Sequence, residues 1–429
     1  MNRWRHILLA FAIIASRALG QSVELRPVEP VTMPVAVDSN TASFWKDGQF
    51  HMFSSTGTSV LSSGPSATQL SPGVPFDLGG IPEPAWIESA WMSPEGVLFV
   101  WYHHEQMGLC GDVKLNVPQI GAALSYDGGR TMVNLGIVLD ATENRNCAAQ
   151  NGYFAGGHGD FSVTYNDRDG YFYFYFGSYS GEVSEQGVSM ARMPYEARYS
   201  PAGSVEKWFN GGWSEPGLGG RVTPVFPAKV SWYEAGTDSF WGPSVHWNTH
   251  LRQYVMLLNH ACCDPGWPQE GIYISYNPDP ANPAGWSEPR KILEGGAWYP
   301  AAIGTGEGET DSMAGKTARL WVRGFSDWEL VFSTPEEMQA AEPKPPTEPA
   351  LPAEPAPPTE PKPPVEPAPP TEPAPPADPA PPAEPAPPVD PTPPAVVEPG
   401  PGIPEPGPAP DEPAPEAENP PPPVPADPA

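Results

Sequence analysis

Three carboxylates stand at the beginnings of short apolar segments in the first half of the chain. Asp38 lies in VAVDSNTASFW, Glu88 in EPAWIESAW and Asp160 in GGHGDFSV. Cleavage of a glycosidic bond requires one protonated carboxyl group and one ionised carboxylate. The tryptophans on either side of Glu88 provide apolar surroundings that favour its protonated form. An aspartate on the opposite wall could activate water, so these three residues form the candidate catalytic group.

Aromatic and histidine side chains accompany the carboxylates. Aromatic faces pack against the apolar faces of sugar rings, and histidines exchange hydrogen bonds with hydroxyl groups. The candidate substrate-binding residues are Trp86, His104, His158, Trp241, His246 and Trp298.

The histidines also offer a different chemistry. His103 and His104 would point to opposite faces of an extended strand, so at most one of them can face the carboxylates. His104, His158 and His246 could together bind a metal ion. A metal-dependent hydrolase or lyase would follow from that arrangement. No cofactor is otherwise assigned.

A repeated pattern of strand, turn and strand positions these residues. A strand ends in a polar turn such as Lys46-Asp47-Gly48, and a second, more apolar strand follows, which is typical of β-hairpins. Two of the units continue with a third strand and a serine-containing turn. The units begin near Ser43, Trp86, Asp160, Gly242 and Trp298.

Five units of four strands predict an all-β fold, a five-bladed β-propeller over residues 30–335. A large β-sandwich is the alternative, but it would not require this repeat. In a propeller the first strand of each blade lines the central axis. Carboxylates at the starts of first strands are therefore expected to converge at one end of the axis.

The segment SYDGGRT, residues 125–131, matches most of the Asp-box turn found in sialidases and other propellers. Met132 stands where that motif usually has tryptophan. The Asp-box is a structural turn, so it supports the propeller fold and does not indicate sialidase chemistry.

The four cysteines, Cys110, Cys147, Cys262 and Cys263, allow three disulfide pairings. A bond between the adjacent pair is strained, because adjacent Cα atoms lie about 3.8 Å apart and disulfides usually span about 4.4–6.8 Å. The alternative joins each of these two to Cys110 or Cys147. All four cysteines are expected at the carboxylate end of the propeller, where disulfides would fix the rim of the pocket.

The two ends of the chain differ from the body. Residues 1–20 have the basic, apolar and small-residue regions of a secretory signal peptide, which predicts a secreted, periplasmic or cell-envelope protein. The apolar run is too short to span a membrane, so no membrane insertion is expected. Residues 342–429 are rich in proline and acidic residues, which predicts a disordered, extended spacer without an assigned partner.

The formal net charge of −29 bears on the choice of partner. An acidic surface repels nucleic acid and anionic membranes. Uncharged carbohydrate meets no such repulsion, so carbohydrate is the expected partner.

The layout of blades with acids at their starts resembles the five-bladed propeller glycoside hydrolases, namely the arabinanase and β-xylosidase families and their relatives. It is also similar to secreted bacterial members of that superfamily without an assigned activity. The resemblance covers residues 30–335. It implies a glycoside hydrolase acting on a neutral polysaccharide or oligosaccharide, with a structural calcium or other metal on the axis.

One departure from these families concerns the order of the acids. The arabinanase-like families have Asp, Asp and Glu in chain order, acting as base, modulator and acid. Here the order is Asp38, Glu88 and Asp160, so the resemblance assigns no individual roles. The alternative is a non-catalytic carbohydrate-binding or cell-envelope protein in which the proline-rich tail provides reach.

Overall fold

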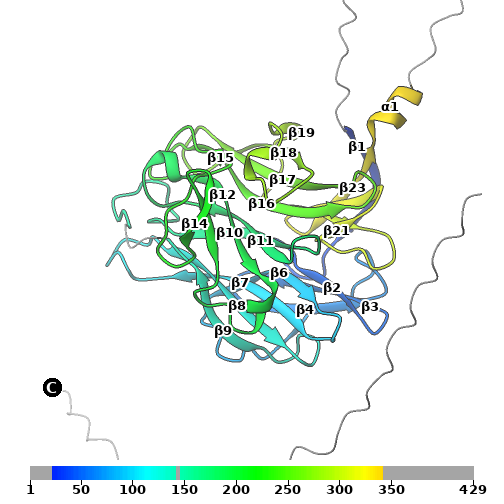
Figure 1. Cartoon of the computed structure of the whole chain (residues 1–429), viewed down its shortest axis with the longest axis horizontal. Helices are drawn as coiled ribbons and strands as arrows, with labels where there is room; N and C mark the ends of the chain where they lie inside the picture. Colours follow the sequence, from blue (N-terminus) through cyan, green and yellow to red (C-terminus); the bar gives the residue numbers. More distant parts are fainter. Residues whose placement is uncertain (1–21, 142–144, 342–429) are drawn as a thin grey trace, which may run out of the picture. The chain divides into compact units, whose positions relative to one another are not determined.

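The computed structural model describes residues 22–141 and 145–341, and in this part of the chain nearly all regular structure is β-strand (Figure 1). A seven-residue helix, α1 (Pro335–Ala341), follows the last strand. None of the described helices is long and apolar enough to cross a membrane. The predicted signal peptide (1–20) and proline-rich tail (342–429) lie outside the described residues.

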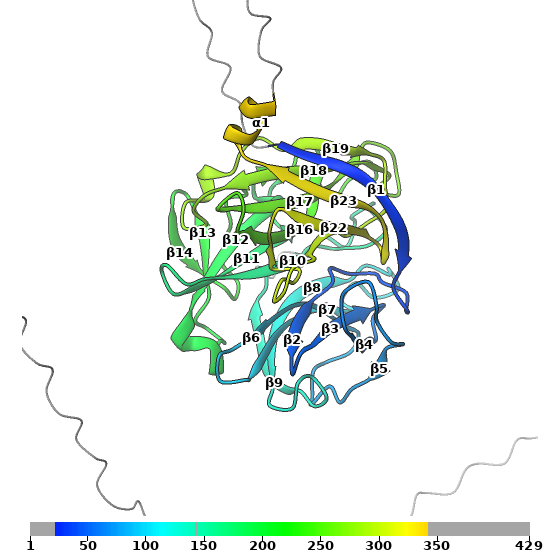
Figure 2. The same cartoon turned by 90° about the vertical axis from the view of Figure 1, so that its right-hand side faces the viewer.

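The strands form five sheets arranged around a common centre (Figure 2). The first sheet contains β2 (Ser43–Lys46), β3 (Gln49–Ser55), β4 (Ser59–Gly64) and β5 (Val74–Pro75). The second contains β6 (Ala85–Met92), β7 (Leu98–Gln106), β8 (Val117–Ser125) and β9 (Val133–Leu139). The third contains β10 (His158–Asn166), β11 (Tyr171–Ser178), β12 (Gly187–Pro194), β13 (Glu206–Phe209) and β14 (Gly212–Pro216), with β15 (Phe226–Pro227) paired to β12.

The fourth sheet contains β16 (Asp238–Asn248), β17 (Gln253–Cys262), β18 (Gln269–Asn277) and β19 (Arg290–Glu294), with β21 (Met313–Ala314) running parallel to β16. The fifth contains β20 (Pro300–Gly304), β22 (Thr317–Val322), β23 (Phe325–Ser333) and β1 (Ser22–Thr32). Short 3₁₀ helices occur at Val183–Glu185, Tyr195–Tyr199 and Pro283–Gly285.

This topology confirms the predicted five-bladed propeller, with each blade beginning at or within five residues of its predicted start. The innermost strands β2, β6, β10, β16 and β20 come from the five predicted repeats. The blades are less uniform than the four-strand pattern suggested, because the third and fourth sheets carry additional short strands.

Strand β1 closes the ring. It pairs antiparallel with β23, from Ser22 opposite Ser333 to Thr32 opposite Phe325. Val23 and Leu25 pack against the core shared by the fourth and fifth blades. This strand lies mostly before residue 30, the predicted start of the propeller, and was not predicted. The fifth blade therefore joins the N-terminal segment of the body to its C-terminal segment.

The cores lie between neighbouring blades, as the alternating YFYFYF segment of β11 illustrates. Phe172, Phe174 and Phe176 pack into the core shared with the second blade. Tyr173 and Tyr175 point to the other face of the sheet and pack into the core shared with the fourth blade. Successive strand residues face opposite sides, so a strand buried on both faces has a large, mainly apolar side chain at every position.

The Asp-box is a structural turn between β8 and β9, as predicted. Asp127 Oδ1 accepts hydrogen bonds from Ser125 Oγ at 2.7 Å and from the amides of Arg130 and Thr131 at 3.0 Å each. The Gly129 amide donates to Ser125 Oγ at 2.8 Å.

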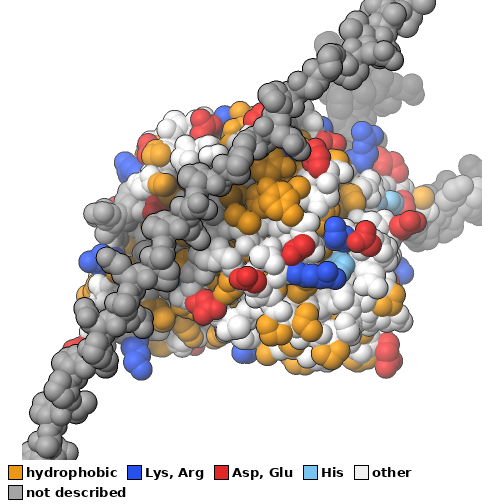
Figure 3. All heavy atoms as spheres, turned by 90° about the horizontal axis from the view of Figure 1, so that it is seen from below, with side chains coloured by type: hydrophobic (Ala, Val, Ile, Leu, Met, Phe, Trp, Pro, Cys, Tyr) orange, Lys and Arg blue, Asp and Glu red, His pale blue; other side chains and the backbone are white. Residues whose placement is uncertain are grey.

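The surface of the body mixes both signs of charge. On the face seen in Figure 3, acidic and basic side chains lie close to one another beside patches of hydrophobic side chains.

Candidate active site at one end of the propeller axis

Glu88 and Asp160 occupy equivalent β-bulges in consecutive blades. The register between β6 and β7 shifts between Ile87 and Ser89, and the register between β10 and β11 shifts between Gly159 and Phe161. A bulge adds one residue to a strand and re-aims its side chain. Asp160 also has a φ of 46°, in the left-handed region that few side chains adopt. The two bulges turn both carboxylates toward one histidine.

That histidine is His103, on β7. Its Nδ1 lies 3.3 Å from Glu88 Oε1 and 3.9 Å from Asp160 Oδ1. Its Nε2 lies 3.7 Å from Glu105 Oε1, too far for a direct hydrogen bond. Glu88, His103 and Asp160 are 1%, 3% and 2% exposed, so the cluster is almost completely removed from solvent.

The protons of this cluster follow from its charges. Burial opposes a charge on His103, but the hydrogen bond and charge of Glu88, with Asp160 and Glu105 adding, raise the pKa of His103 to about 9. Burial also raises the pKa of Glu88 to about 7, against the opposing effect of His103. Nδ1 is also 3.3 Å from the Asp160 amide nitrogen. Because three carboxylates surround the ring, we assign a proton to Nδ1 that is donated to Glu88, rather than an acceptor role toward that amide.

Further hydrogen bonds fix each carboxylate. Asp160 Oδ2 accepts from the hydroxyl of Tyr179, and Oδ1 accepts from that of Tyr299 at 3.0 Å. Glu88 Oε2 accepts from the Phe161 amide at 2.7 Å. Glu105 Oε2 accepts from Asn116 Nδ2 at 2.6 Å. The carboxylates therefore have partners that hold them in one geometry.

Asp38 stands apart from this compact group. It is half-buried and lines a cavity of about 400 Å³ together with Thr56 and Arg323. Burial raises the pKa of Asp38, the charge of Asp160 adds to the shift, and Arg323 and His103 oppose it. Asp38 is thus the member of the predicted triad that borders open space.

Aromatic side chains cover this end of the axis. One buried cluster contains Phe154, Tyr179, Trp232, Trp241 and Trp267, and Trp298 and Tyr299 pack against it. These seven residues are called here the cover. Tyr179 and Tyr299 belong both to this cover and to the hydrogen bonds of Asp160. The cover and the carboxylates are therefore one connected unit.

The disulfide Cys110–Cys147 links two loops at the same end. It joins the loop after β7 to the segment that leads into β10. That segment carries Tyr153 and Phe154, whose rings lie 4.7 and 5.9 Å from the ring of Trp267. The predicted role of the cysteine loops at the rim agrees with these contacts.

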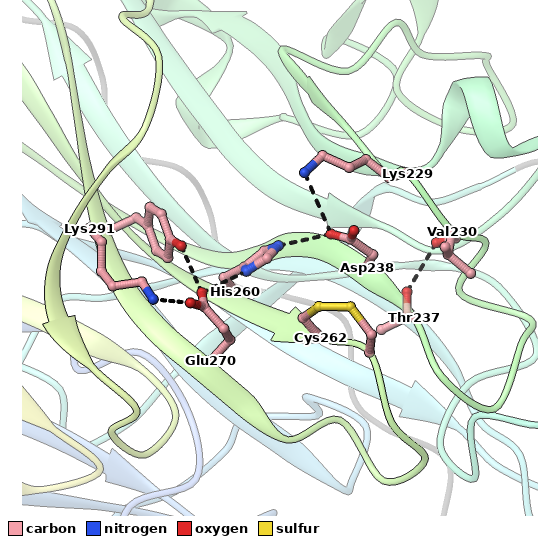
Figure 4. Close-up of a disulfide and its surroundings, with 10 residues drawn as sticks. Lys229, Val230, Thr237, Asp238, His260, Cys262, Glu270 and Lys291 are labelled. Atoms are coloured by element: carbon pink, nitrogen blue, oxygen red, sulfur yellow. Dashed lines mark hydrogen bonds and ion pairs between the residues drawn. A yellow bond between two sulfur atoms is a disulfide. The ribbon is translucent and has the colours of Figure 1, made fainter.

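The other disulfide joins the adjacent Cys262 and Cys263 (Figure 4). It lies beside Asp238, whose Oδ1 is 2.9 Å from His260 Nε2. His260 Nδ1 lies 2.9 Å from Glu270 Oε2, so the imidazole bridges two carboxylates. Trp267 follows in the same loop, so this disulfide also belongs to the rim.

The predicted substrate-binding residues are less closely grouped. Trp86 contacts His103, with ring centroids 5.3 Å apart. Trp241 is 2% exposed and bonds Gln269, and Trp298 lies under the guanidinium of Arg323. Trp86 thus borders the carboxylates, while Trp241 and Trp298 belong to the cover.

The predicted histidines lie elsewhere. His104 Nδ1 is 3.0 Å from the carbonyl oxygen of Pro84, His158 packs against Phe176, and His246 packs against Phe332. Alternation along the strand correctly predicted that only one of the two adjacent histidines faces the carboxylates. That residue is His103, whereas His104 had been predicted to bind substrate. Burial lowers the pKa of His158, and it lowers that of His246 to about 3, so both are neutral core residues.

The residues that could hold a metal are therefore different from the predicted set. Ligand atoms of Glu88, His103 and Asp160 lie within 4.8 Å of one another, and carboxylate with imidazole suits divalent cations. Among the described residues, no group of three candidate ligands contains His104, His158 or His246. A cation would have to displace the proton on His103.

Solved structures similar to this chain include glycoside hydrolases. A family 43 glycoside hydrolase from Bacillus licheniformis has 13% sequence identity and a TM-score of 0.42, over 72% of each chain. The catalytic domain of a GH62 α-L-arabinofuranosidase from Coprinopsis cinerea has 10% identity and a TM-score of 0.43, over 73% of this chain and 97% of that one.

An exo-1,5-α-L-arabinanase from a bovine ruminal metagenomic library has 12% identity and a TM-score of 0.41, over 69% of this chain and 92% of that one. No protein-family model matches the sequence, and no curated protein matches it. The assignment of the propeller fold rests on the five sheets of this chain.

Proposed function

We propose that this chain is a glycan-active propeller that hydrolyses glycosidic bonds at the end of the axis that holds Asp38, Glu88 and Asp160. One observation carries the proposal: Glu88 and Asp160 from consecutive blades face one histidine, the charge of Asp160 also acts on Asp38, and burial raises the pKa of Glu88 to about 7. A carboxyl group with that pKa can donate a proton at neutral pH.

The spacing of the acids suggests how the roles divide. The ligand atoms of Glu88 and Asp160 lie within 4.8 Å of one another. Retaining glycosidases separate their two carboxyl groups by about 5–5.5 Å, and inverting ones by about 6.5–9.5 Å. Glu88 and Asp160 also face the same nitrogen of His103, at 3.3 and 3.9 Å, so they lie on one side of the site rather than on opposite sides of a sugar. We therefore assign Glu88 as the proton donor, Asp160 as the group that positions it, and Asp38 as the opposing carboxylate.

Access to Glu88 requires movement of the cover. Glu88 is 1% exposed, and Tyr299 packs over Asp160. A substrate can reach the proton donor only if Tyr299 and the neighbouring rings shift, as lids do in many enzymes.

The substrate class follows from charge. The chain carries 51 acidic and 22 basic residues, which favours a neutral glycan over an anionic one. A secreted or envelope location, with residues 342–429 as a spacer, fits an extracellular polysaccharide. Amino-terminal sequencing of the exported protein would test the cleavage of residues 1–20.

The experiment is a release assay on arabinan, xylan, galactan and glucan with purified protein. We expect reducing-end release by the wild type and its loss in Glu88→Gln and Asp38→Asn. Asp169→Asn is the control and should retain release, because Asp169 also accepts a hydrogen bond from a tyrosine hydroxyl, that of Tyr173 at 2.7 Å, but lies away from this end of the axis. If the wild type releases sugar and both Glu88→Gln and Asp38→Asn release as much, the assignment of Glu88 and Asp38 as catalytic residues is wrong.

A non-catalytic glycan-binding protein is the second candidate. The observation in its favour is that Glu88, His103 and Asp160 are at most 3% exposed and bond one another. Such a cluster can serve structure alone. Calorimetric binding of an oligosaccharide without any release over a long incubation would favour this candidate.

A further inference from the structure

Four blades place an aromatic residue at the same position of the innermost strand. Trp45, Trp91, Tyr165 and Trp247 are the penultimate residues of β2, β6, β10 and β16. Each stands opposite an aromatic residue of the second strand; the pairs are Trp45–Phe50, Trp91–Phe99, Tyr165–Phe172 and Trp247–Tyr254.

These four residues, called here the aromatic ring, lie at the end of the axis opposite the carboxylates. On β10, for example, Asp160 is near the first residue of the strand and Tyr165 is near the last. All four line one cavity of about 590 Å³. All four remain half-buried although they border the axis. Cavities of about 300–1,000 Å³ are typical of small-molecule sites.

The fifth blade completes the cavity with a loop in place of an aromatic residue. The connection between β20 and β21 contributes Thr310 and Ser312, β21 contributes its first residue, Met313, and the connection lies at the centre of the blades in Figure 2. Asp311 anchors this loop to the first blade, because its Oδ1 accepts from the amide of Ser43 at 2.8 Å and from the hydroxyl at 2.6 Å.

Polar groups border the aromatic faces. Arg168 lies over the ring of Trp247 at 5.2 Å and is held there by Asn166 Oδ1 at 3.2 Å. Trp45 Nε1 donates to the Glu309 carbonyl at 2.8 Å, which fixes the indole. Asp167 and Thr249 are exposed at the edge. The cavity thus combines fixed rings with hydrogen-bonding groups at its rim.

We propose that this cavity is a binding site for a neutral sugar, separate from the carboxylate end. The C–H groups on the face of a sugar ring are slightly positive and match the negative faces of aromatic rings. The hydroxyl groups at the sugar's edge match Asp167, Arg168 and the hydroxyls of Thr310 and Ser312. The inference does not rest on hydrolysis at the other end.

A polyproline peptide is the competing occupant, since aromatic-lined grooves also bind proline-rich chains. Such a chain is extended and needs a groove that is open at both ends. Here all five blades contribute to the wall around the cavity. The geometry therefore favours a compact ligand or the end of a glycan chain.

The test is calorimetric titration of the wild type with arabino-, xylo-, galacto- and gluco-oligosaccharides up to millimolar concentration. Trp247→Ala and Trp91→Ala should each weaken binding of one of these sugars about tenfold or more. Trp213→Ala is the control, because Trp213 is a half-buried tryptophan on β14 outside the cavity. Circular dichroism confirms that each variant is folded.

Met313→Trp keeps the test valid if an aromatic variant does not fold. Met313 lines the cavity and is 37% exposed, so a larger side chain fills the space without removing a core ring. It should also abolish binding. Glu88→Gln should leave this binding intact, which separates it from the hydrolytic proposal. Three results would overturn the inference. The first is an unchanged sugar affinity in Trp247→Ala and Met313→Trp. The others are a wild type that binds no sugar, and a wild type that binds a polyproline peptide in place of sugars.

Discussion

Nδ1 of His103 lies 3.3 Å from Oε1 of Glu88, and the two side chains are only 4% and 1% exposed. The pair joins the second strand of the second blade to its first strand, and Asp160 brings the third blade to the same point. One buried imidazolium thus holds together carboxylates that would otherwise repel each other.

Removal of the imidazolium should destabilise the fold. In His103→Gln, Glu88 and Asp160 remain buried without a positive partner, which costs roughly 3–5 kcal/mol. Urea unfolding at neutral pH measures the loss. His250→Gln is the control, because His250 pairs with Glu337 at 2.9 Å but both are substantially exposed, so its effect should be small. Equal stability of the two variants would show that the cluster is not charged as described.

The same cluster should make stability depend on pH. The pKa of His103 is raised from 6.5 to about 9, and that of Glu88 from 4.5 to about 7. The folded state therefore binds protons more tightly than the unfolded chain. The contribution of Glu88 is complete below pH 4.5 and is lost as the pH rises through 7. That of His103 is complete below pH 6.5 and is lost as the pH rises through 9.

Measuring the free energy of unfolding across these pH ranges tests whether stability falls as the pH rises. The wild type should lose stability with rising pH relative to a Glu88→Gln/His103→Gln double variant, which has neither titrating group. Parallel curves for the two proteins would contradict the raised pKa values.

The Cys110–Cys147 disulfide should stabilise the cover more than the Cys262–Cys263 disulfide does. Cys110 and Cys147 are 37 residues apart, which corresponds to about 4 kcal/mol of lost chain entropy in the unfolded state. The adjacent cysteines close no comparable loop. The contributions of the two disulfides can be compared by thermal unfolding and limited proteolysis of two variants, in each of which one cysteine pair is replaced by serines. We expect Cys110→Ser/Cys147→Ser to be cleaved first between residues 145 and 157; equal behaviour would refute this.

Closure by β1 should be essential to the ring. Leu25 stands opposite Leu330 and packs into the core of the fourth and fifth blades. Leu25→Asp buries a charge there and should cost at least about 2 kcal/mol. Glu24→Gln, on the exposed face of the same strand, should leave the melting temperature unchanged. A similar melting temperature for Leu25→Asp would mean that β1 is dispensable.

The sequence predicted the blades well because each hairpin is a local pattern. Turns such as Lys46-Asp47-Gly48 separate strands that pair with their immediate neighbours. β1 escaped prediction because its partner, β23, lies about 300 residues away and its sequence contains two prolines within the strand. Alternation alone could not reveal which residues of so distant a pair would meet.

The site was only partly predictable for a related reason. Asp38, Glu88 and Asp160 were found because they begin repeats. The choice between His103 and His104 failed because alternation places the two on opposite faces of β7 without showing which face meets the carboxylates. His103 shares the face of Phe99 and Trp101, which pack toward the third blade. Tyr179 and Tyr299 bond Asp160 from two different blades, which only the closed ring brings together. The aromatic ring was present in the sequence as SFWK, AWM, TYN and HWN, at the ends of first strands.

The most direct test of the central claim is the kcat of Glu88→Gln on the oligosaccharide that the wild type cleaves best. Glutamine keeps the size of the side chain and its bond to the Phe161 amide but has no proton to donate. We predict that kcat falls about a hundredfold or more, while Asp169→Asn retains wild-type kcat and both variants keep the wild-type circular dichroism. A kcat for Glu88→Gln equal to that of the wild type would contradict the account.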